Sequence, residues 1–258
     1  MSLVSQAATL VAFPVAASTI GAVVATVKPP GPRFVSGVQH FAAGVVTAAL
    51  VGEIMPELRA EGHLGSTVIG FVAGALLVLA LGAYGRHTEE DAAIAAAESE
   101  SAHGEVVSKG IRTARLKTAA VALPIGMLGA VAIDLLLDGV LVGLGVRLGS
   151  TQGIILTIAL TLEILFLGLS VVSELHEGGL ARRHAVMMTI GLGLTTAVGA
   201  IGAALFLGGV STNIMSFVLA FGAAALLYLV VEELLVEAHE ERESVWLGAM
   251  FFLGFILI

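Results

Sequence analysis

The 258-residue chain contains no cysteine and few charged residues, and both absences narrow its chemistry. Without cysteine, disulfides, thiolate metal ligands and thiol nucleophiles are excluded. Only 12% of the residues are charged, whereas a soluble domain averages about 25%. Hydrophobic residues make up 57% of the chain and the mean hydropathy is +1.02. We therefore expect an integral membrane protein with the lipid bilayer as its first partner.

Several functional motifs are also missing. No glycine-rich loop ending in Gly-Lys-Ser/Thr is present, so we do not expect ATP hydrolysis. His176-Glu177 lacks the second histidine of a metalloprotease HExxH motif, and no basic surface pattern indicates a nucleic-acid partner. We expect no enzyme, with neither catalytic nor cofactor-binding residues. The N-terminal stretch MSLVSQAATLVAF has no basic region before its apolar run, which favours a first membrane span over a cleaved signal.

The apolar runs predict an all-α, polytopic membrane helical bundle, because a spanning helix needs roughly 20 apolar residues. We expect one transmembrane domain over residues 1–258, with a mobile, partly helical loop at about 85–116. Turn and charge signals such as KPPGPR, RAEGHLG and EGGLARR separate the runs. The eight predicted transmembrane helices are 3–27, 34–57, 65–84, 117–147, 152–178, 183–208, 213–238 and 243–258.

The basic residues predict the orientation of these spans. Ten of the 12 lysines and arginines fall in the first, third, fifth and seventh loops, and only Arg59 and Arg147 fall on the other side. Because basic loops stay in the cytoplasm, we expect a multi-pass protein of the cell (inner or plasma) membrane. Both termini are then extracellular or periplasmic, and the 85–116 loop is cytoplasmic.

Carboxylates inside the predicted spans are the strongest functional signal, because intramembrane charge is costly and usually marks an ion pathway. Asp134 and Asp138 are four residues apart and share one helix face, as do Glu53 with Glu57 and Glu233 with Glu237. Stacked carboxylates repel each other unless a proton or cation lies between them. Asp134 and Glu163 are flanked by apolar residues on both sides, so a functional role is favoured for them.

Other candidates lie nearer the predicted span ends. Glu57, Glu174, Glu177 and Glu237 can reach water there, and a structural role is favoured for these four. His176 lies near the predicted cytoplasmic mouth, where an exit-ligand role and a structural role are equally compatible with the sequence. The candidate metal residues are Asp134, Asp138, Glu163, Glu233, Glu53, Glu237 and His176.

The pattern resembles the ZIP (Zrt/Irt-like protein) family of divalent-metal transporters, as a divergent, bacterial-type member. Residues 40–58, HFAAGVVTAALVGEIMPEL, are similar to the family's second span, and YLVVEELLVEAHEE at 228–241 is similar to its seventh. Asp138-Gly139 matches the end of the family's fourth-span His-Asn-x-x-Asp/Glu-Gly motif, with Asp134 and Leu135 at the His and Asn positions. Glu163 to Gly168 resembles the fifth-span motif, with Leu167 in place of its metal-binding acid. The resemblance implies eight spans and suggests a homodimer.

The departures from the family motifs predict one metal site rather than two adjacent ones. Leu135 and Leu167 offer no lone pair, which leaves Asp134, Asp138 and Glu163, with Glu233 as a fourth candidate ligand. An all-oxygen site suits Mg²⁺ or Mn²⁺ and gives less advantage to zinc. Zinc, iron and cadmium also bind carboxylates, so the transported metal ion stays open among these five.

The sequence thus favours a ZIP-like transporter that moves divalent metal cations through a carboxylate-lined intramembrane site toward the cytoplasm. Two alternatives stay open. The first is a proton-coupled or monovalent-cation carrier on the same fold. The second is an intramembrane enzyme or a non-transporting, metal-sensing membrane protein.

Overall fold

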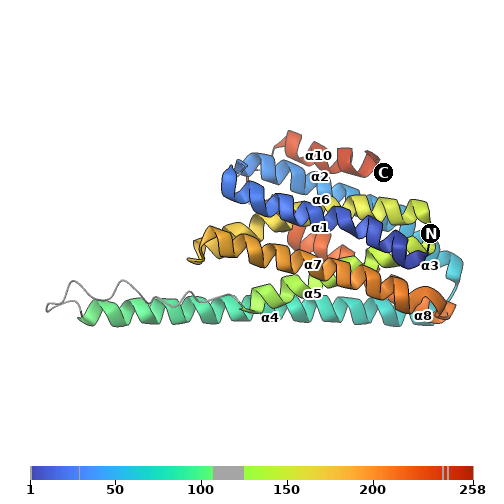
Figure 1. Cartoon of the computed structure of the whole chain (residues 1–258), viewed down its shortest axis with the longest axis horizontal. Helices are drawn as coiled ribbons and strands as arrows, with labels where there is room; N and C mark the ends of the chain where they lie inside the picture. The colour runs from blue at the N-terminus through green and yellow to red at the C-terminus, as the bar shows by residue number, and fades with distance from the viewer. Residues whose placement is uncertain (1, 29, 107–124, 240, 243, 258) are drawn as a thin grey trace.

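The computed structural model describes residues 2–28, 30–106, 125–239, 241–242 and 244–257. It is built from helices that run nearly side by side in one bundle (Figure 1). The α-helices are α1 (Leu3–Val27), α2 (Pro32–Ala49), α3 (Met55–Glu61), α4 (Leu64–Val106), α5 (Ile125–Leu148), α6 (Ser150–Glu177), α7 (Arg182–Phe206), α8 (Thr212–Tyr228), α9 (Leu235–Ala238) and α10 (Val245–Leu257). Two π-helical segments join neighbours into single spans, η1 (Leu50–Ile54) between α2 and α3, and η3 (Leu229–Leu234) between α8 and α9; η2 (Leu207–Gly209) is a short 3₁₀ turn after α7.

Glycine and proline set the helix boundaries that the sequence indicates. Pro32 is the first residue of α2, where its missing N–H costs no hydrogen bond. Gly62 ends α3 with a φ of 70°, and Gly179 turns the chain between α6 and α7 with a φ of 93°. Both are left-handed conformations that glycine adopts without strain. The predicted breaks RAEGHLG and EGGLARR therefore fall at real turns.

The chain is a multi-pass, all-α membrane protein. Seven helical segments within the described residues are long and apolar enough to cross a bilayer, and the eighth predicted span is shorter than expected. Helix α10 covers 13 residues, which is about 20 Å against the roughly 30 Å of a hydrocarbon core. It begins only after the charged stretch HEERES, and residues 243 and 258 of the predicted span lie outside the described residues.

Helix α4 is the main departure from the sequence prediction. We expected the third span to end near Tyr84 and a mobile, partly helical loop to follow, whereas one helix continues unbroken to Val106. The sequence after Tyr84 is rich in alanine and glutamate and contains no proline, which favours helix. Figure 1 shows this extension leaving the bundle on one side, which we name the extension side. Residues 107–124, which include the rest of the predicted loop and the start of the predicted span 117–147, lie outside the described residues.

The helices pack in two matched sets. Helix α1 packs on α6 as α7 packs on α5, and α2 packs on α10 as α8 packs on α4. Close backbone contacts repeat as well. Gly21 and Gly168 meet Leu165 and Ser18 across α1 and α6, while Gly199 and Gly139 meet Leu136 and Thr196 across α7 and α5. Since α1 and α7 run in opposite directions (Figure 1), this is an inverted-topology repeat.

The repeat is also visible in the sequence. Residues 41–57, FAAGVVTAALVGEIMPE, align without a gap to residues 221–237, FGAAALLYLVVEELLVE. The alignment pairs Phe41 with Phe221, whose carbonyl oxygens face Gly254 and Gly74 respectively. It also pairs Glu53 with Glu233, and it places both glutamates in a π-helical segment. The acids of the two halves are therefore related by the same pseudo-two-fold symmetry as the helices.

Candidate metal centre

Three carboxylates from two antiparallel helices form a compact cluster in the middle of the bundle. Asp134 and Asp138 lie one turn apart on α5, and Glu163 faces them from α6. One carboxylate oxygen from each residue lies within 4.8 Å of the other two. Among the described residues this is the one group of histidines, cysteines or acids whose atoms could surround a metal ion.

Asp138 and Glu163 are buried, and four of the six carboxylate oxygens of the cluster lack a protein partner. Asp138 is 2% exposed and Glu163 is 3% exposed. Oδ2 of Asp134, Oδ2 of Asp138 and both carboxylate oxygens of Glu163 are buried without a hydrogen-bond donor. At 4.8 Å, two ionised carboxylates repel each other by about 3.5 kcal/mol at an effective dielectric constant of about 20. A cation held between them would satisfy these oxygens and cancel the repulsion.

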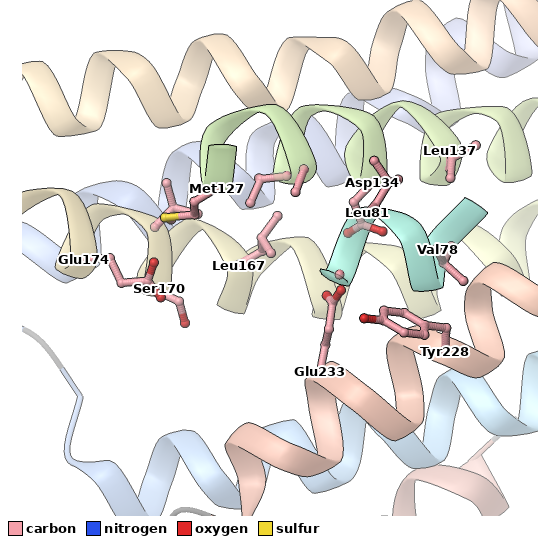
Figure 2. A pocket seen from close by; sticks show the side chains of 14 residues that line it. Val78, Leu81, Met127, Asp134, Leu137, Leu167, Ser170, Glu174, Tyr228 and Glu233 are labelled. Atoms are coloured by element: carbon pink, nitrogen blue, oxygen red, sulfur yellow. The ribbon is translucent and has the colours of Figure 1, made fainter. Parts of the chain in front are cut away.

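A cavity of about 240 Å³ leads away from Asp134. Figure 2 shows the carboxylates of Asp134 and Glu233 and the hydroxyl of Tyr228 pointing into the same space. Glu233 interacts electrostatically with Asp138 and Glu163, so it belongs to the electrostatic environment of the cluster. No lysine, arginine or histidine is among the described residues that line this cavity.

The first cavity adjoins a second one that reaches the extension side. Ser170 and Glu174 line both cavities. The second has a volume of about 640 Å³ and is bounded by the start of α2, the end of α6 and Glu241. Together they form a path from the cluster to the extension side, with carboxylates at Glu233, Glu174 and Glu177.

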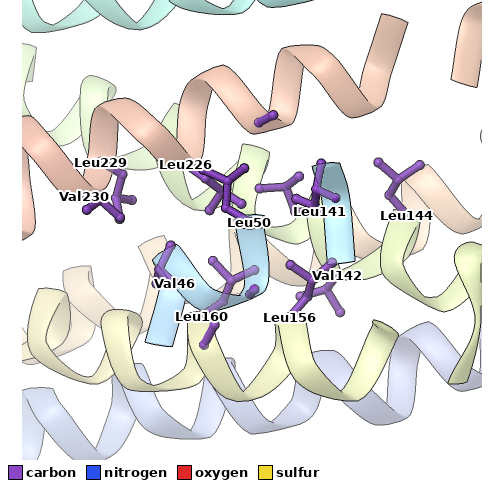
Figure 3. Packing of buried hydrophobic residues seen from close by; sticks show 14 of the residues in the cluster. Val46, Leu50, Leu141, Val142, Leu144, Leu156, Leu160, Leu226, Leu229 and Val230 are labelled. Carbon is purple, nitrogen blue, oxygen red and sulfur yellow. The ribbon is translucent and has the colours of Figure 1, made fainter. Parts of the chain in front are cut away.

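The cluster is closed on the other side by packed aliphatic side chains. Leu141, Val142, Leu156 and Leu160 are each at most 2% exposed and belong to the main hydrophobic core. Figure 3 shows them interdigitating between the helices near Leu50 and Leu226. We name these four residues the leucine plug. The site is thus approached from one side of the molecule.

Among the described side chains, Glu53 and His176 are not part of the three-residue cluster. Glu53 lies in η1, is half-buried and lines neither cavity. His176 lies at the end of α6, where Nδ1 contacts the Leu180 carbonyl at 3.0 Å and Nε2 accepts a hydrogen bond from Arg182 Nε at 3.3 Å. Glu237 lies in α9, and its side chain is outside the described part of the structure.

Sequence reasoning missed Tyr228 and Ser170 as lining residues of the cavity. Tyr228 precedes Glu233 by five residues, and the π-helical segment between them, with its i to i+5 hydrogen bonds, brings both side chains to the cavity. The internal repeat was the available signal, because it pairs the two acid-bearing segments at 50–54 and 230–234.

Comparison with known proteins gives no family for this chain. No protein-family model matches it, and no curated protein matches it. The chain is a polytopic helical membrane protein with a buried acidic cluster that could hold a metal ion.

Proposed function

We propose that this protein transports divalent metal cations across the membrane, through the cluster of Asp134, Asp138 and Glu163. The observation that carries the proposal is the set of four buried carboxylate oxygens without a partner, within binding distance of one another. A protein that did not bind a cation would gain nothing from three acids at this depth, since each costs at least a few kcal/mol there. The ZIP resemblance of the same residues supports this reading.

The location of the cluster favours transport over static binding. Its path to the extension side is lined by further carboxylates, and a static structural site would need no such path. Basic loops at 28–33 and 182–183 lie on the extension side, which supports a cytoplasmic location for that side. The direction of transport that we propose is toward the cytoplasm.

Ligand chemistry favours a hard cation. Every donor in the cluster is a carboxylate oxygen, and Tyr228 and Ser170 add only hydroxyl oxygens nearby. Oxygen-only sites suit Mn²⁺ and Mg²⁺ better than zinc, which usually recruits nitrogen or sulfur. We therefore take Mn²⁺ as the first cation to test, followed by Mg²⁺, Fe²⁺, Zn²⁺ and Cd²⁺.

The test is Mn²⁺ uptake into proteoliposomes, together with Mn²⁺ binding by calorimetry in detergent. We expect Asp138→Asn and Glu163→Gln to lose both binding and uptake, because each removes a ligand that water cannot replace at that depth. Glu57→Gln is the matched control, since Glu57 in α3 lines neither cavity. Unchanged Mn²⁺ uptake in Glu163→Gln, or an equal loss in all three variants, would refute the assignment.

A further inference from the structure

The pseudo-two-fold symmetry relates the open cavity to the closed leucine plug. The matched contacts pair Leu136 and Gly139 of α5 with Leu165 and Gly168 of α6. Continued along the two helices, the same correspondence pairs Met127 with Leu156, Val131 with Leu160, Ser170 with Leu141, and Val171 with Val142. The first member of each pair lines the cavity and the second belongs to the leucine plug. One half of the repeat lines the open cavity, whereas the four equivalent residues of the other half are each at most 2% exposed.

The same correspondence pairs the acids. Asp134, which lines the cavity, is paired with Glu163, which lies 97% buried beside the leucine plug with both carboxylate oxygens unpartnered. Glu163 is only 3% exposed. Only a rearrangement of the leucine plug would therefore bring its side chain to a cavity wall. Asp134 already occupies that position on the extension side.

Glu53 and Glu233 occupy equivalent positions in the two halves of the repeat. Each lies in a π-helical segment and is half-buried, after two exposed residues and before a buried one. The following residues, Ile54 and Leu234, are 0% and 6% exposed. Glu233 lines the present cavity, whereas Glu53 does not.

We propose that Glu53 is the cation ligand of a second binding position, reached from the side opposite the extension when the leucine plug separates. In that state Glu53 lines the newly opened cavity as Glu233 lines the present one. Glu163 likewise reaches the wall of that cavity, as Asp134 does in the present structure. This inference rests on the proposed transport function. Two near-equivalent halves give two arrangements of similar energy, so a cation with affinity for both can pass between them.

The absence of native cysteine makes the test direct, because a single introduced thiol is unique. Val131→Cys and Leu160→Cys are a symmetry-related pair, one in the cavity and one in the plug. Each is labelled with a membrane-impermeant maleimide in right-side-out and inside-out vesicles, with and without Mn²⁺. We expect Val131→Cys to react from the extension side and Leu160→Cys to react from the opposite side. At Mn²⁺ about ten times above Kd, each rate should fall about tenfold by mass action.

The two glutamates should then separate the two positions. Glu233→Gln should remove Mn²⁺ protection of Val131→Cys and leave protection of Leu160→Cys. Glu53→Gln should do the reverse, and its retained protection of Val131→Cys shows that this variant is folded. Leu156→Cys replaces Leu160→Cys if the latter does not take up Mn²⁺.

Three results distinguish the claims. If Glu53→Gln leaves protection intact on both sides, Glu53 is not a ligand and the inference fails. If neither Leu160→Cys nor Leu156→Cys reacts from the opposite side while Mn²⁺ uptake continues, the plug is not a gate and the inference also fails. If Mn²⁺ protects no position and is not taken up, the proposed transport function itself fails.

Discussion

Replacing Glu163 by glutamine should raise the stability of the metal-free protein and remove its stabilisation by Mn²⁺. Both carboxylate oxygens of Glu163 are buried and unpartnered, and Asp134 and Asp138 lie within 4.8 Å. Two repulsions of about 3.5 kcal/mol each are an upper limit, because bound protons reduce them and the amide leaves its own hydrogen bonds unmet. We expect a net gain of about 1–3 kcal/mol, which is less than half of that upper limit.

The assay is thermal unfolding in detergent, followed by size-exclusion chromatography of heated samples. For a chain of this size 1 kcal/mol corresponds to about 2–4 °C, so the variant should melt about 2–12 °C above the unmodified protein without metal. Mn²⁺ at about 100 times Kd should stabilise the unmodified protein by about 2.7 kcal/mol and leave the variant unchanged. The difference between the melting temperatures of the variant and the unmodified protein should then shrink or change sign when Mn²⁺ is added.

The pH dependence follows from the same repulsion. It exists only where the carboxylates are ionised, so the advantage of the variant should be largest at high pH and should shrink as pH falls. Glu57→Gln, outside the cluster, is the control and should change the melting temperature little. A Glu163→Gln protein that melts lower than the unmodified one without metal would show that this carboxyl group has a stabilising partner. Equal stabilisation of both proteins by Mn²⁺ would show that the ion does not use Glu163.

Four further outcomes are expected. Gly139→Ala should destabilise the fold, because a Cβ there would lie 2.0 Å from the Thr196 carbonyl oxygen. Gly129→Ala is the control and should not destabilise it, since a Cβ there would meet no atom within 4 Å. Thermal unfolding of the two variants tests this. Leu167→Glu should add a second Mn²⁺ per chain in calorimetry, since Leu167 lines the cavity at the position equivalent to Asp138. Mn²⁺ affinity of the unmodified chain should fall as pH falls, because protons compete for the same oxygens; a flat titration would contradict this. Cysteine placed within residues 95–105 should react with a membrane-impermeant maleimide only from the cytoplasmic side.

The depth and identity of the central acids could be predicted from the sequence, because charge is rare within apolar runs and each exception is visible. The spacing of Asp134 and Asp138 fixes their common face without any tertiary information. Their meeting with Glu163 depends on how α5 and α6 rotate about their axes, which the sequence constrained only through the family resemblance. Glu53 shows what the sequence alone does not predict. It has the same local pattern as Glu233, but which of the two faces the cavity depends on the conformation of the whole bundle.

The ends of the helices were harder to predict than their centres. The segment after Tyr84 has the composition of a solvated, charged chain, and its alanines and glutamates are equally good helix formers. Hydropathy marks where a helix leaves the bilayer and carries no information on where the helix ends. Helix α4 therefore outlasts its apolar run by about six turns at 3.6 residues per turn.

The difference between Asp138 and Leu167 decides how much charge the site holds. These two residues are equivalent under the pseudo-symmetry, so a symmetric site would carry an acid at both positions. With leucine at one of them, the three clustered acids carry at most −3, and Glu233 brings the total to −4. One divalent ion reduces the net charge of the four carboxylates to −2, and a few bound protons or water-mediated contacts can offset the charge that remains. A fifth carboxylate would require a second cation. The single leucine at position 167 therefore predicts one bound ion per chain.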